Sequence, residues 1–125
     1  MLTVGIKHSE KFIVLYEHTA KNIQSGGLEV LATPALIGFM EKCAWQSVLP
    51  MMNEGFDTVG ISIDMKHLAP TPIGDIVKCE SELIAIHNRE LTFHITAHSN
   101  NKKIGETTHK RFIIQIDKFI NKTII

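Results

Sequence analysis

A carboxylate interrupts the apolar side of the longest helix that the sequence predicts. The stretch ATPALIGFMEKCAWQSVL covers residues 32–49, and at about 100° per residue its apolar side chains gather in one arc. Glu41 falls inside that arc, and Thr33 lies on the same arc about 12 Å nearer the N-terminus. An unpaired carboxylate there is costly, so Glu41 is expected to have a partner, to bind a proton or to face a wet cleft. The alternative is a position at the edge of the stripe, with the head group in solvent.

The same stretch begins with the signals of a helix start. Thr33 is predicted to be the N-cap, because its hydroxyl can accept from the free amides of the first turn. Pro34 suits the first helical position, where its missing N–H sacrifices no hydrogen bond. We therefore predict one long helix over residues 34–49.

A histidine lies on the apolar face of a predicted strand. Residues 58–68, TVGISIDMKHL, alternate so that four apolar side chains and His67 share one face, which should meet the helix. Glu41 and His67 would then form an acid–base pair that can take a proton from water or protonate a leaving group. The alternative is a core histidine held by one backbone hydrogen bond.

Gly60 interrupts this strand where a side chain is expected. One explanation is a β-bulge. The other is that a ligand approaches the backbone here and uses an amide as an oxyanion donor. The pattern alone leaves both open.

The remaining elements describe an α+β fold. Predicted strands cover residues 11–17, 58–68, 75–87, 90–99 and 102–116. Short turn-like connections favour antiparallel hairpins, and the polar segment before the helix reads as a flap. One helix cannot cover five strands, so we expect the sheet to curl around it and a second copy to cover the remaining edge or face.

Composition narrows the class of protein. A chain of 125 residues suits a single domain over residues 1–125, and its 13 basic and 13 acidic residues balance, which argues against nucleic acid or an anionic membrane as a partner. Two cysteines without a CxxC pair favour reduced, buried thiols in a cytoplasmic protein. We expect neither a secretory signal nor a membrane span.

These residues together resemble the hotdog fold, an antiparallel sheet wrapped around one long central helix. Within that fold, LATPALIGFMEKCAWQSVLP followed by GISIDMKHLAPTPIGD resembles acyl-CoA thioesterases related to fluoroacetyl-CoA thioesterase. The later stretch RELTFHITAHSNNKKIGETTHKRFII fits the same family. The resemblance implies a thioester hydrolase that acts as a homodimer with sites at or near the subunit interface, and leaves a tetramer open.

The resemblance also implies roles for individual residues. It assigns catalysis to Thr33, Glu41 and His67, and substrate binding to the Gly60 amide and Arg111. A thioester carbonyl would lie between that amide and the three catalytic groups, and the substrate would be an acyl-CoA or another acyl thioester. No metal or other cofactor is expected, because a thiolate is already a good leaving group. The flap segment EHTAKNIQSGGLE lacks the aromatic residues that form an apolar lid in the fluoroacetyl-specific enzyme. The resemblance therefore does not identify the acyl group of the substrate.

Three other functions are compatible with parts of this pattern. An enoyl-thioester hydratase or dehydratase would use acid–base chemistry on the same fold, but its His/Asp motif is absent from the sequence. A non-catalytic acyl-CoA-binding protein would explain a pocket without needing the three catalytic groups. A metal site built from His94, His98 and His109 is disfavoured because strand positions i and i+4 lie about 13 Å apart, and we interpret these histidines as surface residues.

Overall fold

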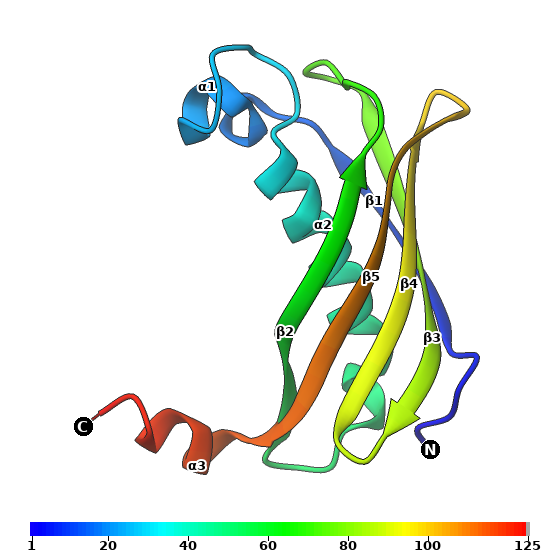
Figure 1. The fold of residues 1–125 in the computed structure, drawn as a ribbon, viewed down its shortest axis with the longest axis vertical. Helices are drawn as coiled ribbons and strands as arrows, with labels where there is room; N and C mark the ends of the chain where they lie inside the picture. Colours follow the sequence, from blue (N-terminus) through cyan, green and yellow to red (C-terminus); the bar gives the residue numbers. More distant parts are fainter. Residues whose placement is uncertain (125) are drawn as a thin grey trace.

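The sheet of this protein curls around its one long helix (Figure 1). The computed structural model describes residues 1–124. In chain order the elements are β1 (Lys7–Ile13), the 3₁₀ turn η1 (Tyr16–His18), α1 (Ala20–Ile23), α2 (Thr33–Val48), the 3₁₀ turn η2 (Leu49–Met51), β2 (Phe56–His67), β3 (Ile76–His87), β4 (Glu90–Ser99), β5 (Lys102–Gln115) and α3 (Ile116–Asn121). Within the described residues, no helix is long and apolar enough to cross a membrane.

The strands pair antiparallel in the order β1-β3-β4-β5-β2. Two-residue turns join β3 to β4 and β4 to β5, and asparagines with positive φ occupy them: Asn88 (56°), Asn100 (50°) and Asn101 (61°). Asparagine tolerates this left-handed conformation better than most residues do. The predicted hairpins are therefore confirmed, and β2 lies at one edge of the sheet.

The core lies between α2 and the concave face of the sheet. The helix contributes Leu36, Met40, Cys43, Ala44 and Val48, all buried, and β4 buries alternate residues along its whole length. The backbone of β5 comes close to the helix at Gly105, where an added Cβ would lie 2.9 Å from Cδ2 of Leu36. The glycine therefore lets helix and sheet meet closely.

Both cysteines lie inside this core as free thiols. Cys43 is on α2 and Cys79 is on β3, and the Cys43 thiol contacts the Cys79 carbonyl oxygen at 3.5 Å. Burial raises the pKa of both thiols, which agrees with the prediction of reduced, buried cysteines.

The largest difference from the sequence pattern is in β2. Its register against β5 shifts between Gly60 and Ser62, so the strand has a β-bulge and the bulge interpretation of Gly60 is correct. The extra residue reverses the alternation, so Gly60 lies opposite the buried Arg111 on the helix side, while Val59 lies opposite the exposed Phe112. The prediction that Gly60 and His67 lie on opposite faces was wrong for this reason.

Candidate active site

The start of α2 and the end of β2 meet through two side chains. Oγ1 of Thr33 and Nδ1 of His67 lie 2.8 Å apart. The N-cap of α2 is Ala32, and Thr33 is the first helical residue, so the prediction of Thr33 as N-cap was wrong by one position. Its hydroxyl hydrogen-bonds the histidine of β2 instead of the free amides at the start of the helix.

The environment of His67 favours a neutral imidazole. Burial lowers the pKa of His67, and a backbone hydrogen bond with Ala69 opposes this effect only in part. If the Thr33 hydroxyl donates to Nδ1, the imidazole carries its own proton on Nε2. That Nε2 atom is buried and has no hydrogen-bond partner among residues 1–124, so its hydrogen-bonding capacity is unused within the chain.

A cavity of about 430 Å³ opens beside this pair. Thr33 and His67 both line it, and the flap between β1 and α2 forms part of its wall. The flap residues in the wall are small or aliphatic: Ala20, Ser25, Val30 and Leu31. The arrangement gives a wide, largely apolar space next to a hydroxyl–imidazole pair.

Glu41 lies further along α2, over Gly60 of β2. A Cβ atom added to Gly60 would lie 2.7 Å from Oε2 of Glu41, closer than real Cβ contacts allow. The same point would lie 3.6 Å from Nη1 of Arg111. Gly60 therefore leaves the space that the Glu41 carboxylate occupies beside the guanidinium.

Arg111 is almost fully buried, at 6% exposure. Its Nε donates to Oγ1 of Thr58 at 2.9 Å and its Nη2 donates to the Thr58 carbonyl oxygen at 2.9 Å. Its Nη1 lies 3.2 Å from Nε2 of His109, which is also buried. The interpretation of His109 as a surface histidine was wrong, because it faces α2 from the concave side of β5.

Burial is the largest effect on the pKa values of Arg111 and His109. It lowers the pKa of Arg111, whereas the charges of Glu41 and Asp57 raise it. It also lowers the pKa of His109, where the hydrogen bond to Ser62 and the charge of Glu41 oppose it and the charge of Arg111 adds to it. The charge of Glu41 thus acts on both of these buried basic side chains.

Within one chain, the predicted site residues form two groups. Thr33 and His67 form the first, and Glu41 with Gly60 and Arg111 forms the second. The two positions on β2 are seven residues apart, roughly 20 Å of extended strand. The sequence pattern singled out four of these residues, and the family resemblance added Arg111. The pattern joined Glu41 to His67 directly, whereas in the chain His67 bonds Thr33.

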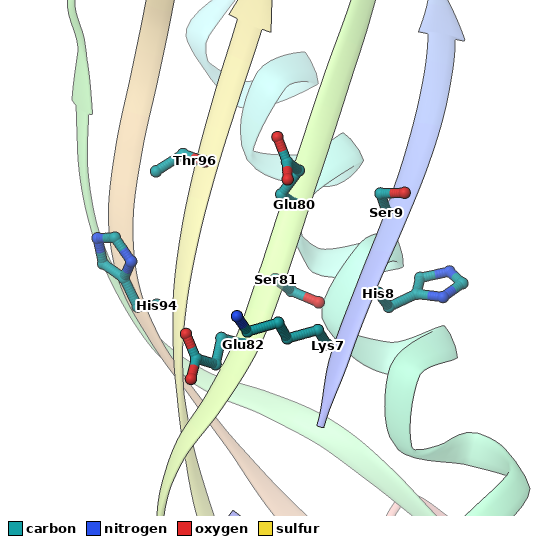
Figure 2. Close-up of a pocket in the computed structure, with 8 residues that line it drawn as sticks. All are labelled: Lys7, His8, Ser9, Glu80, Ser81, Glu82, His94 and Thr96. Carbon is teal, nitrogen blue, oxygen red and sulfur yellow. The ribbon is translucent and has the colours of Figure 1, made fainter. Parts of the chain in front are cut away.

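Another groove lies elsewhere on the surface and has a different character (Figure 2). It measures about 520 Å³, and β1, β3 and β4 contribute its side chains. Glu80, Glu82, His94 and Thr96 line it and alternate with buried residues, so they project from the face away from α2. His94 bonds Oε1 of Glu106 at 3.1 Å, as a surface histidine does. This open, charged groove shares no residue with either group above.

Comparison with known proteins places the chain in a family. The family model described as fluoroacetyl-CoA-specific thioesterase matches residues 14–117. The fluoroacetyl-CoA thioesterase of Streptantibioticus cattleyicolor is 29% identical over 124 residues, covering 94% of this chain and 89% of that protein.

Solved structures agree with this assignment. A structure of the fluoroacetyl-CoA thioesterase superposes with a TM-score of 0.93 at 29% identity, over 98% of this chain and 96% of that one. A hot-dog-like protein from Thermanaerovibrio acidaminovorans shares the fold, with a TM-score of 0.89 at 21% identity over 98% of this chain and 90% of that one. The chain therefore belongs to the fluoroacetyl-CoA-specific thioesterase family, and it is a hotdog-fold thioester hydrolase.

Proposed function

We propose that this protein hydrolyses acyl-CoA thioesters at a site that two copies of the chain build together. The observation that carries the proposal is the position of Thr33 and His67, hydrogen-bonded at 2.8 Å and lining the same cavity. Glu41 supplies the carboxylate that completes a thioester-cleaving set, but in one chain it lies near Gly60 instead. Pairing of two subunits supplies what one chain lacks.

The edge strand β2 suggests how the subunits pair. It carries one group near Gly60 and the other at His67, and it lies at an edge of the sheet. If two β2 strands pair antiparallel about a two-fold axis near Ile63 and Asp64, Gly60 of one subunit comes near the partner subunit's His67. Each of the two sites then takes Glu41 and Arg111 from one subunit, and Thr33 and His67 from the other.

The chemistry follows from these groups. The thioester carbonyl lies between them, and Glu41 either removes a proton from the attacking water or attacks the carbonyl itself. The Gly60 amide stabilises the oxyanion, an effect typically worth about 3 kcal/mol. The C–S bond then breaks, and the leaving CoA thiolate takes a proton from His67, which recovers it from the protonated Glu41 or from the water that reacts last. Where Glu41 attacks the carbonyl, water then hydrolyses the acyl–Glu41 anhydride, so that in both routes the products are the free acid and CoA.

The flap supports an acyl group wider than fluoroacetyl. Among residues 1–124, no phenylalanine, tyrosine or tryptophan lines the cavity beside Thr33, and its wall at the flap is small or aliphatic. We therefore propose short to medium aliphatic acyl groups as substrates. We also propose a cytoplasmic location, where acyl-CoA is available and where two buried free thiols stay reduced.

A thiol-release screen tests the activity. Wild-type protein, Glu41→Gln and His67→Ala are assayed with acyl-CoAs of increasing chain length and branching. We expect release of CoA thiol by wild type and a loss of about a hundredfold or more in each variant. Full turnover by both variants would remove these residues from the mechanism. Loss of enoyl absorbance without thiol would indicate hydration instead.

Mixing two inactive variants tests the shared site. Glu41→Gln and His67→Ala proteins are each purified, mixed, unfolded and refolded together. In a mixed dimer, one site receives both substitutions and the other receives neither, so activity returns. If each site were built from a single chain, every site in the mixture would carry one substitution and no activity would return.

A further inference from the structure

The buried guanidinium of Arg111 is held by neutral acceptors on three sides. Thr58 accepts from Nε through its hydroxyl and from Nη2 through its carbonyl, each at 2.9 Å. The third acceptor is Nε2 of His109, 3.2 Å from Nη1. Nη1 is also the guanidinium atom nearest to the space over Gly60 that Glu41 occupies. His109 is therefore the acceptor beside the guanidinium nitrogen nearest to Glu41, while Thr58 holds the other two nitrogens.

The tautomer of His109 is fixed by its other nitrogen. Nδ1 lies 2.9 Å from the carbonyl oxygen of Ser62, and a carbonyl can only accept, so Nδ1 carries the proton. Nε2 then keeps a lone pair, which is what a guanidinium N–H requires. The ring is 1% exposed and lies against Phe93, with ring centroids 6.2 Å apart, so packing opposes its rotation.

The charges around this imidazole come from three elements. Arg111 lies two residues along the same strand, Glu41 faces it from α2, and Asp57 on β2 acts on the guanidinium. The β4 side contributes the apolar ring of Phe93. A proton added to His109 would place a second cation beside Arg111 and convert its acceptor nitrogen into a donor.

We propose that His109 is a positioning residue of the active site, which acts through Arg111. Its neutral imidazole, held by Ser62, accepts from Nη1 of Arg111 and keeps the guanidinium directed at the Glu41 carboxylate over Gly60. Protonation of His109 removes this acceptor and repels the guanidinium, so hydrolysis falls on the acid side. This role rests on the thioester hydrolysis proposed above, in which Glu41 acts on the substrate.

Three substitutions at one position separate the role from simple packing. In His109→Gln, the longer amide places an oxygen near the position of Nε2, where it can accept from Arg111. In His109→Asn, the shorter amide can replace only the donor to Ser62, and His109→Leu fills space without either bond. His94→Leu is the matched control, because His94 lies on the opposite face of the sheet.

The expected results differ in kcat and in pH profile. His109→Gln should keep most of the wild-type kcat and reduce the fall in activity on the acid side to the part that His67 contributes, because an amide does not titrate. His109→Asn and His109→Leu should lose about tenfold to a hundredfold in kcat with KM near wild type, since Arg111 is displaced. His94→Leu should match wild type. Loss in the glutamine variant as large as in the leucine variant would overturn the proposal, as would a leucine variant with wild-type kinetics.

Nitrogen-15 NMR of the wild-type imidazole tests the proposal without an activity assay. We expect His109 to be neutral at pH 7 with its proton on Nδ1, and a proton on Nε2 would overturn the proposal. Because it uses the wild-type protein, this measurement still tests the role of His109 if a variant does not fold. If wild type releases no thiol from any acyl-CoA, the proposed function fails, and the tautomer still shows whether His109 can hold Arg111 as described.

Discussion

The hydroxyl of Thr33 bonds His67 instead of capping α2, and this separates its effect on activity from its effect on stability. Thr33→Val keeps the shape of the side chain and removes the hydroxyl. We expect kcat to fall by about a hundredfold, because His67 loses the partner that orients it. The free energy of unfolding should change by only about 1 kcal/mol, the typical contribution of one hydrogen bond.

Thr33→Ser is the matched control for this prediction, since it keeps the hydroxyl. Steady-state kinetics and thermal melts of both variants check it. A valine variant as active as the serine variant would show that the bond to His67 has no part in catalysis.

The space above Gly60 gives a second prediction at the same scale. In Gly60→Ala, the new methyl would lie 2.7 Å from Oε2 of Glu41, so the carboxylate must move. The obstacle is the end of a flexible side chain, so the fold should survive while kcat/KM falls by about tenfold or more.

Gly38→Ala in α2 serves as the control for the substitution at Gly60. A Cβ there meets nothing within 4 Å, and alanine favours a helix interior by up to about 1 kcal/mol over glycine. This variant should keep full activity and melt at a higher temperature. Equal kinetics for the two alanine variants would contradict the role given to the space over Gly60.

Single residues were predictable where they broke a pattern. Glu41 stood out as a charge on an apolar arc, and His67 as an imidazole at the end of an apolar face; both now line or adjoin the site. His109 was missed because it alternates regularly with polar neighbours on β5, and nothing in the sequence says which face of that strand is buried. His109 is a polar side chain on the concave face of the sheet, and only the pairing of β5 with β2 shows that it lies on that face.

At the scale of elements, the flap controls the size of the cavity beside Thr33. Val30 lines this cavity and is bridged to Pro72, so its position is fixed. Val30→Phe should fill part of the space and shift the preferred substrate to shorter acyl groups, mainly by raising KM for longer ones. Kinetics over a series of acyl chain lengths measures this shift.

Leu28→Phe is the control for the flap, because Leu28 is in the same segment, is 69% exposed and does not line the cavity. Its chain-length profile should match that of wild type. An unchanged profile in Val30→Phe would mean that the acyl group binds away from the flap.

The presence of the main strands and the long helix was predictable from the sequence. Which side chains of a strand face the core was not. The long helix and four of the five strands occur where hydrophobic periodicity placed them, whereas β1 spans Lys7–Ile13 instead of residues 11–17. The short helix α3 was not predicted, and only its first residue, Ile116, fell within the predicted strand of residues 102–116. The helix is six residues long, too short to give a helical periodicity in the sequence. The β-bulge at Gly60 reversed the alternation in β2. The sequence of an interrupted strand does not show where the extra residue is, so it does not show which side chains change face.

For the whole molecule, one half-buried histidine, His67, and one buried histidine, His109, couple stability to pH. Burial lowers the pKa of both His67 and His109 from an ordinary value of 6.5, so the unfolded chain binds protons at a pH where the folded chain does not. The free energy of unfolding should therefore be greatest above pH 6.5 and fall as the pH decreases through the lowered values.

Thermal melts across the acid range measure this coupling. His109→Leu should reduce the loss of melting temperature on acidification, since it removes one of the two groups. His87→Leu, at an exposed histidine, should leave the slope unchanged. A wild-type melting temperature that rises as the solution is made more acidic would contradict the assignment of both imidazoles as neutral in the folded state.

The core position of Cys43 and Cys79 has a practical consequence for measuring turnover. Neither sulfur is exposed, and both resist ionisation, so a colorimetric disulfide reagent should leave the native enzyme unmodified while it reacts with each coenzyme molecule set free. Hydrolysis can thus be followed continuously in the presence of the reagent. The same reagent, without substrate, reports how often the interior opens, because labelling of either sulfur requires the helix and sheet to separate.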